Sequence, residues 1–414
     1  MAEPLPRLRM DLEFMPSPVQ DRPGLLIRDP YHYSDSTLIV PPALVACLQF
    51  FDGVQTALDL RAELVRLTGD LQSGDLERHL RETLSEAGFC EDETYQRLRE
   101  RQQAIFAQAE WRAPAHAGSA YPAEPDQLKD KLSNYLGGDG APAPRSGLVG
   151  IAAPHVSPDG GYGCYRAAYA ALGPEYRDRV FVILGTSHYG EPDRFGLTRK
   201  SFVTPLGAAR TAAELVGELA ATGGGAVKLE DYAHAVEHSI EFQVVFLQHI
   251  YGPDIRILPI LCGPFFRSAQ NGAAPEDDES IRQFLSALGE IAAREAGNLF
   301  WVLGIDMAHM GRRYGDSFSA RADAGEMAGV AELDRKRIGS IEAGDAAGFW
   351  TAVHGLRDPL KWCGATPLYA FLRAVPGARG ELLRYQQWNI DDHSVVTFGA
   401  IAFRNQGQYC AATQ

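Results

Sequence analysis

Apolar residues along the chain occur in two patterns, uninterrupted runs and helical spacing. Uninterrupted apolar runs, which are typical of strands buried on both faces, begin near Gly147, Arg179, Ile255 and Leu299, and a last strand is expected near 394–403. Between them, helical spacing predicts helices over 125–136, 161–172, 211–221, 280–295, 324–340, 345–355 and from Pro367. This alternation predicts an α/β domain with a mixed or mostly parallel sheet flanked by helices.

The first 90 residues show a different pattern. Residues 25–40 predict a small hairpin. Helical patterns follow over 41–51, 56–68 and 73–88. A hairpin and three helices within residues 25–88 predict a small winged-helix-like domain. The predicted organisation is a winged-helix-like domain over 1–90, a polar helical linker over 91–116 and the α/β domain over 117–414.

The order of elements in the small domain resembles the peptide-chaperone domains of the PqqD type. Those domains bind a substrate peptide along a strand edge, so the resemblance implies a peptide or protein partner. The alternative is a helical module for dimerisation or packing. DNA binding is disfavoured because the segment has no basic recognition helix.

Length and composition narrow the class of protein. A single hydrophobic core stops growing near ~250 to 300 residues, so a chain of 414 residues is expected to form more than one domain. Its 39 Lys and Arg against 53 Asp and Glu give a net charge of −14, which argues against a nucleic-acid partner. Residues 1–24 have no apolar signal region and no run reaches the ~20 apolar residues of a membrane span, so we expect a cytoplasmic protein without a membrane partner. The six cysteines lie far apart, and disulfides are not expected.

Residues that could bind a metal follow the predicted strands. His155 and His188 come directly after two apolar runs, and Asp306 and His309 follow a third. In an open α/β sheet, ligands gather beyond the carboxyl ends of the strands, and imidazole is the commonest metal-binding side chain. Cys363 precedes a predicted helix, whose positive end would stabilise a thiolate. These positions predict a metal or acid/base site at one edge of the sheet.

A second motif suggests a different chemistry. Residues His234-Ala-Val-Glu-His238 spell H-x-x-E-H, the signature of one group of zinc peptidases. On a helix, His234 and His238 would share one face and bind Zn(II), which would leave Glu237 as the general base. A zinc metallohydrolase is therefore one alternative.

From about Ala117 to Phe403 the chain resembles the Memo family, whose fold is similar to that of the class III (LigB-type) extradiol dioxygenases. The matching segments follow the order of the family. They are Ala117-Gly-Ser-Ala-Tyr-Pro-Ala, Ala153-Pro-His155, Gly185-Thr-Ser-His188, Thr204-Pro-Leu-Gly207, Glu237-His-Ser-Ile-Glu241, Asp306 with His309, and Cys363-Gly364. The segment Val-Ser-Pro-Asp-Gly-Gly after His155 departs from the shorter Ala-Gly-Tyr type of the family, which predicts a different pocket shape.

The resemblance implies roles for these residues. In the family two histidines and a cysteine hold iron or copper, which corresponds here to His155, His188 and Cys363. The ring-cleaving relatives use Fe(II) held by two histidines and a carboxylate, with a further histidine as acid/base. His309 looks like that acid/base, and Asp306 would orient it or help to bind the metal. A cysteine in place of the carboxylate alters the facial triad and admits Cu or Zn besides Fe(II).

Two classes of function remain open. One is a non-haem iron or copper enzyme related to the dioxygenases, acting on an aromatic or peptide substrate. The other is a non-catalytic protein that binds a metal or a peptide with the same pocket, since similar sites serve both purposes.

Overall fold

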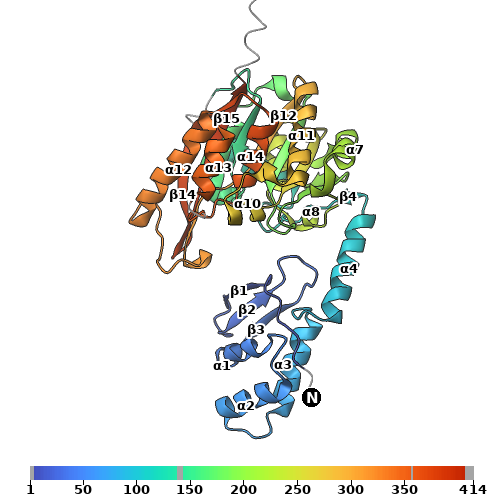
Figure 1. The fold of residues 1–414 in the computed structure, drawn as a ribbon, viewed down its shortest axis with the longest axis vertical. Coiled ribbons are helices and arrows are strands. Elements are labelled where there is room, and N and C mark those ends of the chain that lie inside the picture. Colours follow the sequence, from blue (N-terminus) through green and yellow to red (C-terminus); the bar gives the residue numbers. More distant parts are fainter. Residues whose placement is uncertain (1–3, 138–142, 356–357, 406–414) are drawn as a thin grey trace, which may run out of the picture. The chain divides into compact units, whose positions relative to one another are not determined.

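The computed structural model describes residues 4–137, 143–355 and 358–405 and contains two compact units, Met1–Ala109 and Glu110–Gln414 (Figure 1). The small unit has a three-stranded antiparallel sheet and the large unit has a mostly parallel sheet flanked by helices. Within the described part of the chain, no helix is both long enough and apolar enough to cross a membrane.

The small unit combines a short sheet with helices. Its strands, in the order β1-β2-β3, are β1 (Glu13–Pro16), β2 (Leu25–Arg28) and β3 (Thr37–Val40). Its helices are α1 (Pro42–Val45), the 3-10 helix η1 (Ala46–Phe50), α2 (Ala57–Thr68), α3 (Gly74–Glu86) and α4 (Glu93–Gln108). The predicted hairpin is confirmed as the antiparallel pair β2 and β3, whereas β1 was not expected.

The ends of α2 show why helices form where the sequence predicts them. Thr56 and Asp59 form a capping box, in which each side chain serves a backbone N–H at the first turn. Gly69 ends the helix at φ 72°, a left-handed conformation that glycine adopts without steric cost. Between them, Leu60 and Leu64 are fully buried in the core of the small unit.

The large unit begins with β4 (Trp111–Arg112) and α5 (Pro125–Leu136). Its other strands are β5 (Gly150–Ala153), β6 (Val180–Thr186), β7 (Phe195–Leu197), β8 (Ser201–Thr204), β9 (Gly207–Thr211), β10 (Val227–Leu229), β11 (Arg256–Cys262), β12 (Leu299–Gly304), β13 (His309–Gly311), β14 (Ala378–Asp391) and β15 (Ser394–Asn405). Its other helices are α6 (Pro158–Tyr169), α7 (Ala213–Thr222), α8 (Ala233–Val236), α9 (Glu241–Tyr251), α10 (Phe266–Asn271), α11 (Glu279–Arg294), α12 (Glu326–Glu342), α13 (Ala346–His354) and α14 (Ala365–Ala374). Short 3-10 turns are η2 (Pro174–Tyr176), η3 (Gly224–Ala226), η4 (Pro275–Asp277) and η5 (Arg312–Tyr314).

Four parallel strands form the centre of the large sheet. β12 pairs with β5 on one side and β6 on the other, and β6 pairs with β11. In this register Gly304 lies opposite both Ala153 and Gly185. The carboxyl ends of β5, β6 and β12 therefore lie side by side.

Each face of the sheet is covered by helices. Alternate residues of a strand point to opposite faces. Val180, Val182 and Leu184 of β6 accordingly pack in one core cluster, and Phe181 and Ile183 pack in the other. The first cluster includes residues of α7, α11, α12, α13 and α14, and the second includes residues of α5, α6 and α9. Figure 1 shows α12, α13 and α14 together on one side of the strands.

The strong apolar runs and most helices lie where the sequence predicts them, but β14 was not expected. It pairs antiparallel with β15 through nearly its whole length. Its side chains are mostly half-buried or exposed, so the strand lacks the apolar run that marks a buried strand. β4 lies before the predicted start of the α/β domain at 117, and it belongs to the large unit because it pairs with β8.

Candidate metal centre

Three histidines meet beyond the ends of the central strands. His155 follows β5, His188 follows β6, and His238 lies in the turn between α8 and α9. The ring centroids are 5.0 Å apart for His155 and His188, 5.2 Å for His155 and His238, and 5.1 Å for His188 and His238. One ring nitrogen of each lies within 4.8 Å of the others, which is close enough for the three to hold a metal ion.

The Nδ1 atoms of His155 and His188 are held by hydrogen bonds, and that of His238 lies beside a carboxylate. His155 Nδ1 donates to the carbonyl oxygen of Gly304 at 2.9 Å. The Nδ1 atoms of His188 and His238 each lie 3.1 Å from the carboxylate of Glu237. An acceptor at Nδ1 holds the proton there and leaves Nε2 free as a metal ligand. The donor arrangement therefore fits a metal ion.

Cys363 joins the group from the start of α14. Its Sγ lies 3.4 Å from His155 Nε2 and 3.6 Å from the backbone oxygen of Asp306. Burial opposes ionisation of the thiol, but His155 and His188 outweigh this effect and lower the pKa of Cys363 below its usual value. The thiolate form is thus favoured beside the two imidazoles.

Asp306 and His309 border the same site. Asp306 accepts the backbone N–H of His155 at 3.0 Å, and its Oδ2 lies 3.4 Å from His155 Nε2. Burial raises the pKa of Asp306 to about 6. His309 donates from Nδ1 to the carbonyl oxygens of Met307 and Lys361 at 3.0 and 3.2 Å, and burial lowers its pKa. Asp306 can therefore change protonation near neutral pH.

Glu237 and the neighbouring imidazoles shift each other's pKa. Although burial opposes it, the charge of Glu237 raises the pKa of His188 well above the usual value. Burial likewise opposes ionisation of Glu237, but His188 and His238 lower its pKa well below the usual range. Glu237 is therefore an anion between two imidazoles.

The helical premise of the zinc-hydrolase alternative is wrong. α8 ends at Val236, and Glu237 has an extended backbone with ψ 136°. His234 turns away, donates from Nε2 to the oxygen of Gly196 at 3.0 Å and contacts the ring of Phe202. Among the described residues, the convergent group includes His238 but not His234. The motif fails because its two histidines do not share one face of a helix.

The sequence places Glu237 and His238 both in the H-x-x-E-H motif and in a segment that matches the Memo family, but neither pattern places them with His155. The available signal was the segment Glu237-His-Ser-Ile-Glu241, which matches the Memo family. Glu241 at its end is buried, pairs with Arg112 and accepts a hydrogen bond from Tyr121. These contacts anchor the turn to the start of the large unit.

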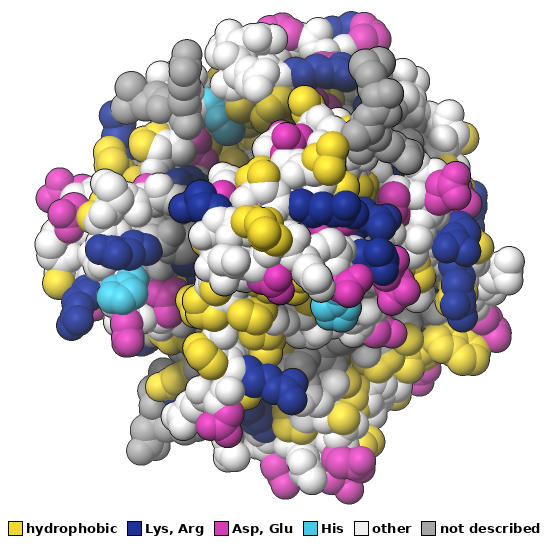
Figure 2. All heavy atoms as spheres, turned by 90° about the horizontal axis from the view of Figure 1, so that it is seen from below, with side chains coloured by type: hydrophobic (Ala, Val, Ile, Leu, Met, Phe, Trp, Pro, Cys, Tyr) yellow, Lys and Arg dark blue, Asp and Glu magenta, His cyan; other side chains and the backbone are white. Residues whose placement is uncertain are grey.

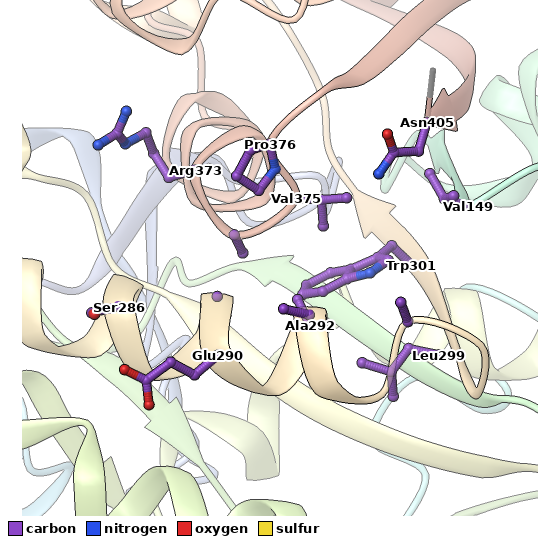
Figure 3. Close-up of a pocket in the computed structure, with 14 residues that line it drawn as sticks. Val149, Ser286, Glu290, Ala292, Leu299, Trp301, Arg373, Val375, Pro376 and Asn405 are labelled. Atoms are coloured by element: carbon purple, nitrogen blue, oxygen red, sulfur yellow. The ribbon is translucent and has the colours of Figure 1, made fainter. Parts of the chain in front are cut away.

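A separate cavity of about 540 Å³ lies at the other end of the strands (Figure 3). Val149 and Leu299 lie at the amino ends of β5 and β12, with Trp301 forming an apolar floor. Figure 3 shows Arg373 and Glu290 at its side. It has no strand-end histidines and is distinct from the candidate metal centre.

These features define a mostly parallel α/β protein with a histidine and cysteine cluster at the strand ends. The chain belongs to the Memo-like protein family, whose model matches residues 112–402. It is 28% identical to a MEMO1 family protein of Aquifex aeolicus, covering 71% of this chain and 74% of the relative. MEMO1 family proteins of Methanopyrus kandleri and Thermococcus kodakarensis are each 30% identical over 71% of this chain and 99% of the relative.

A crystal structure of an uncharacterized protein from Escherichia coli K12 covers 62% of this chain and 99% of its own, with 13% identity and a TM-score of 0.37. This likeness is too distant to support an argument about the site. The family match begins at residue 112, so it does not extend to the small unit. The resemblance of that unit to PqqD-type domains stays a prediction.

Proposed function

We propose that this protein binds a redox-active metal ion, Fe(II) or copper, through His155, His188 and Cys363. The observation that carries the proposal is the Cys363 thiol 3.4 Å from His155 Nε2, with the Nδ1 atoms of both histidines already held by acceptors. Two imidazoles and a thiolate suit iron and copper, and they also admit Zn.

A bound iron or copper ion would supply one-electron and oxygen chemistry to an aromatic or peptide substrate. Asp306, with its pKa of about 6, would exchange protons with the substrate near neutral pH. His309 would present Nε2 as a neutral acid/base, because its Nδ1 is held by backbone carbonyls. In the non-catalytic alternative, the same groups bind a metal or a peptide side chain without turnover.

Anaerobic reconstitution with Fe(II), followed by metal analysis, tests the metal site. We expect His188→Ala and Cys363→Ala to lower the bound iron at least tenfold, while His249→Ala in α9 serves as a control with wild-type iron content. If a variant with both substitutions binds as much iron as the wild type, the metal does not bind at the proposed site. Oxygen uptake with catechols and peptides then separates the enzyme from the binding protein.

We also propose that the small unit binds an extended peptide along β3. This strand has β2 on one side and is the last strand in its sheet. A groove of about 330 Å³ lies between β3 and α3, and its apolar lining includes Leu38, Leu76 and Leu80. Main-chain hydrogen bonds to an edge strand together with an apolar groove suit an added peptide strand.

Binding of fluorescent peptides with alternating apolar residues, measured by anisotropy, tests this surface. Leu76→Glu places a charge in the groove and is expected to abolish binding, whereas Leu71→Glu changes an exposed leucine that does not line the groove. Equal binding by the full chain and by the large unit alone would contradict the proposal.

On the face shown in Figure 2, basic side chains are interspersed with acidic and apolar ones.

A further inference from the structure

Glu237 collects an unusual number of donors for one carboxylate. It is 1% exposed, and its oxygens accept the backbone N–H groups of His188 and His238, each at 2.8 Å, and of Ser239 at 3.1 Å. The same carboxylate lies 3.1 Å from the Nδ1 atoms of His188 and His238. The backbone N–H groups of both histidines and the ring of His188 are thus bound to a single anion.

The turn that carries Glu237 is fixed to the end of β6. Ser239 donates from Oγ to the carbonyl oxygen of Thr186 at 2.8 Å. Gly185 lies beneath the turn, where a Cβ would come within 2.5 Å of Ser239 Oγ and 2.6 Å of Ile240. The position of the carboxylate is therefore set by packing as well as by its own hydrogen bonds.

An ionised carboxylate only accepts hydrogen bonds. The His188 ring must therefore carry a proton on Nδ1, and its Nε2 faces away from Glu237. The Gly304 carbonyl imposes the same tautomer on His155. One ring nitrogen of each of the three histidines lies within 4.8 Å of the others, so all three can bind one ion.

We propose that His238 is a third nitrogen donor of the metal site and that Glu237 is the residue that positions it, by holding the Nδ1 proton of His188 and the backbone N–H of His238. The inference rests on the metal-binding function proposed above. It adds a nitrogen donor to the set of His155, His188 and Cys363. The possible ligands of the metal are therefore the ring nitrogens of His155, His188 and His238 and the thiolate of Cys363.

The first test is made on the metal-free full chain. Long-range ¹H–¹⁵N spectra of ¹⁵N-histidine-labelled protein at pH 8.5 report which ring nitrogen carries the proton. We expect a proton on Nδ1 of His188 in the wild type. In Glu237→Gln the amide NH₂ faces part of this donor set, and His188 is expected to change to the Nε2–H form.

Glu241→Gln is the matched control, because Glu241 is equally buried but accepts its hydrogen bonds from Arg112, Tyr121 and the backbone. This variant is expected to lower the unfolding temperature and leave the tautomers unchanged, because Arg112 still donates to the backbone oxygens of His234 and Glu237. Wild-type tautomers in Glu237→Gln would overturn the positioning role. If Glu237→Gln does not fold, Glu237→Asp keeps the charge on a shorter side chain and is expected to keep the proton on Nδ1 of His188, so its loss there would overturn it too.

The second test uses Co(II), whose visible spectrum reports its ligands. We expect wild-type protein to bind Co(II), and His238→Ala and Glu237→Gln each to weaken binding by at least tenfold. Cys363→Ser should remove the thiolate charge-transfer band while His238→Ala keeps it and changes the d–d bands. An unchanged Co(II) affinity and spectrum in His238→Ala would overturn His238 as a donor.

The outcomes separate this inference from the function on which it rests. Co(II) binding that survives in His238→Ala but not in His188→Ala supports the proposed metal site and overturns the further donor. A wild-type chain that binds neither Co(II) nor Fe(II) overturns both, while the tautomers of the metal-free protein still decide the positioning role of Glu237.

Discussion

The two histidines of one pentapeptide, His234 and His238, have opposite surroundings. His238 has its Nδ1 beside an ionised carboxylate and its ring among two other imidazoles. His234 is fully buried, and its Nδ1 has no hydrogen-bond partner among the described residues. The residue type alone shows only that an imidazole is present at each position. The neighbouring groups decide whether that imidazole can bind a metal or stays neutral in the core.

The burial of His234 predicts a pH-dependent stability. Burial lowers its pKa to about 4, whereas an unfolded histidine titrates near 6.5. As the pH falls from 6.5 to 4, the unfolded chain binds a proton that the folded chain does not, so stability is lost over this window and is fully present above it. We expect this residue to remove about 3 kcal/mol of unfolding free energy between pH 7 and pH 4.

Urea unfolding of the wild type and of His234→Gln at pH 7 and pH 4 measures this effect. Glutamine does not titrate and can still donate to the Gly196 carbonyl. Between pH 7 and pH 4 the variant should therefore lose about 3 kcal/mol less unfolding free energy than the wild type. Equal losses in the two proteins would show that His234 is not the cause.

Among the elements, the ends of β5, β6 and β12 assemble the site. Three parallel strands in one register place their carboxyl ends together, so residues 151 positions apart, His155 and Asp306, become neighbours. The hydrophobic runs predicted these strands well. They did not predict β14, because a half-exposed strand of mixed polarity has no apolar run, or the irregular turn of Glu237 and His238.

Gly304 at the end of β12 has no room for a side chain. A Cβ there would lie 2.2 Å from the backbone oxygen of Ser239 and 3.0 Å from Gln243 Nε2. Gly304→Ala must shift either the strand end, which binds His155 Nδ1, or the turn of His238. We expect a loss of about 1 to 3 kcal/mol in unfolding free energy and a lower iron content.

Gly339 in α12 is the control for this substitution. It is exposed, and nothing lies within 4 Å of a Cβ built there. Gly339→Ala should stabilise the helix by about 0.5 to 1 kcal/mol and leave bound iron unchanged. Thermal unfolding and metal analysis of both variants give the comparison, and equal effects of the two alanines would contradict the close approach at Gly304.

At the scale of the whole molecule, the division at Ala109 and Glu110 places Arg112 in the large unit. Arg112 is buried against Glu241 and donates to the backbone oxygens of His234 and Glu237 at 2.8 Å. The N-terminal end of the large unit thus supports the turn that carries Glu237.

Two truncations test this support. A fragment of 110–414 keeps Arg112, and we expect it to fold and to bind iron like the full chain. A fragment of 117–414 leaves Glu241 buried without its cation, which should cost about 3 to 5 kcal/mol. Thermal unfolding and iron content of the two fragments give the answer, and equal stability would show that the ion pair does not hold the turn.

The sequence by itself determined the α/β class, the central strands, most helices and the family, because apolar periodicity and the order of short motifs are local properties of the chain. It also indicated His155, His188, Asp306, His309 and Cys363, since residues at the ends of buried parallel strands must share one edge. Only the tertiary structure decided the partners of each nitrogen. The separation of His234 from His238 and the sharing of Glu237 by two histidines depend on a turn whose shape is set by packing against β6 and by Arg112, and no local pattern encodes those contacts.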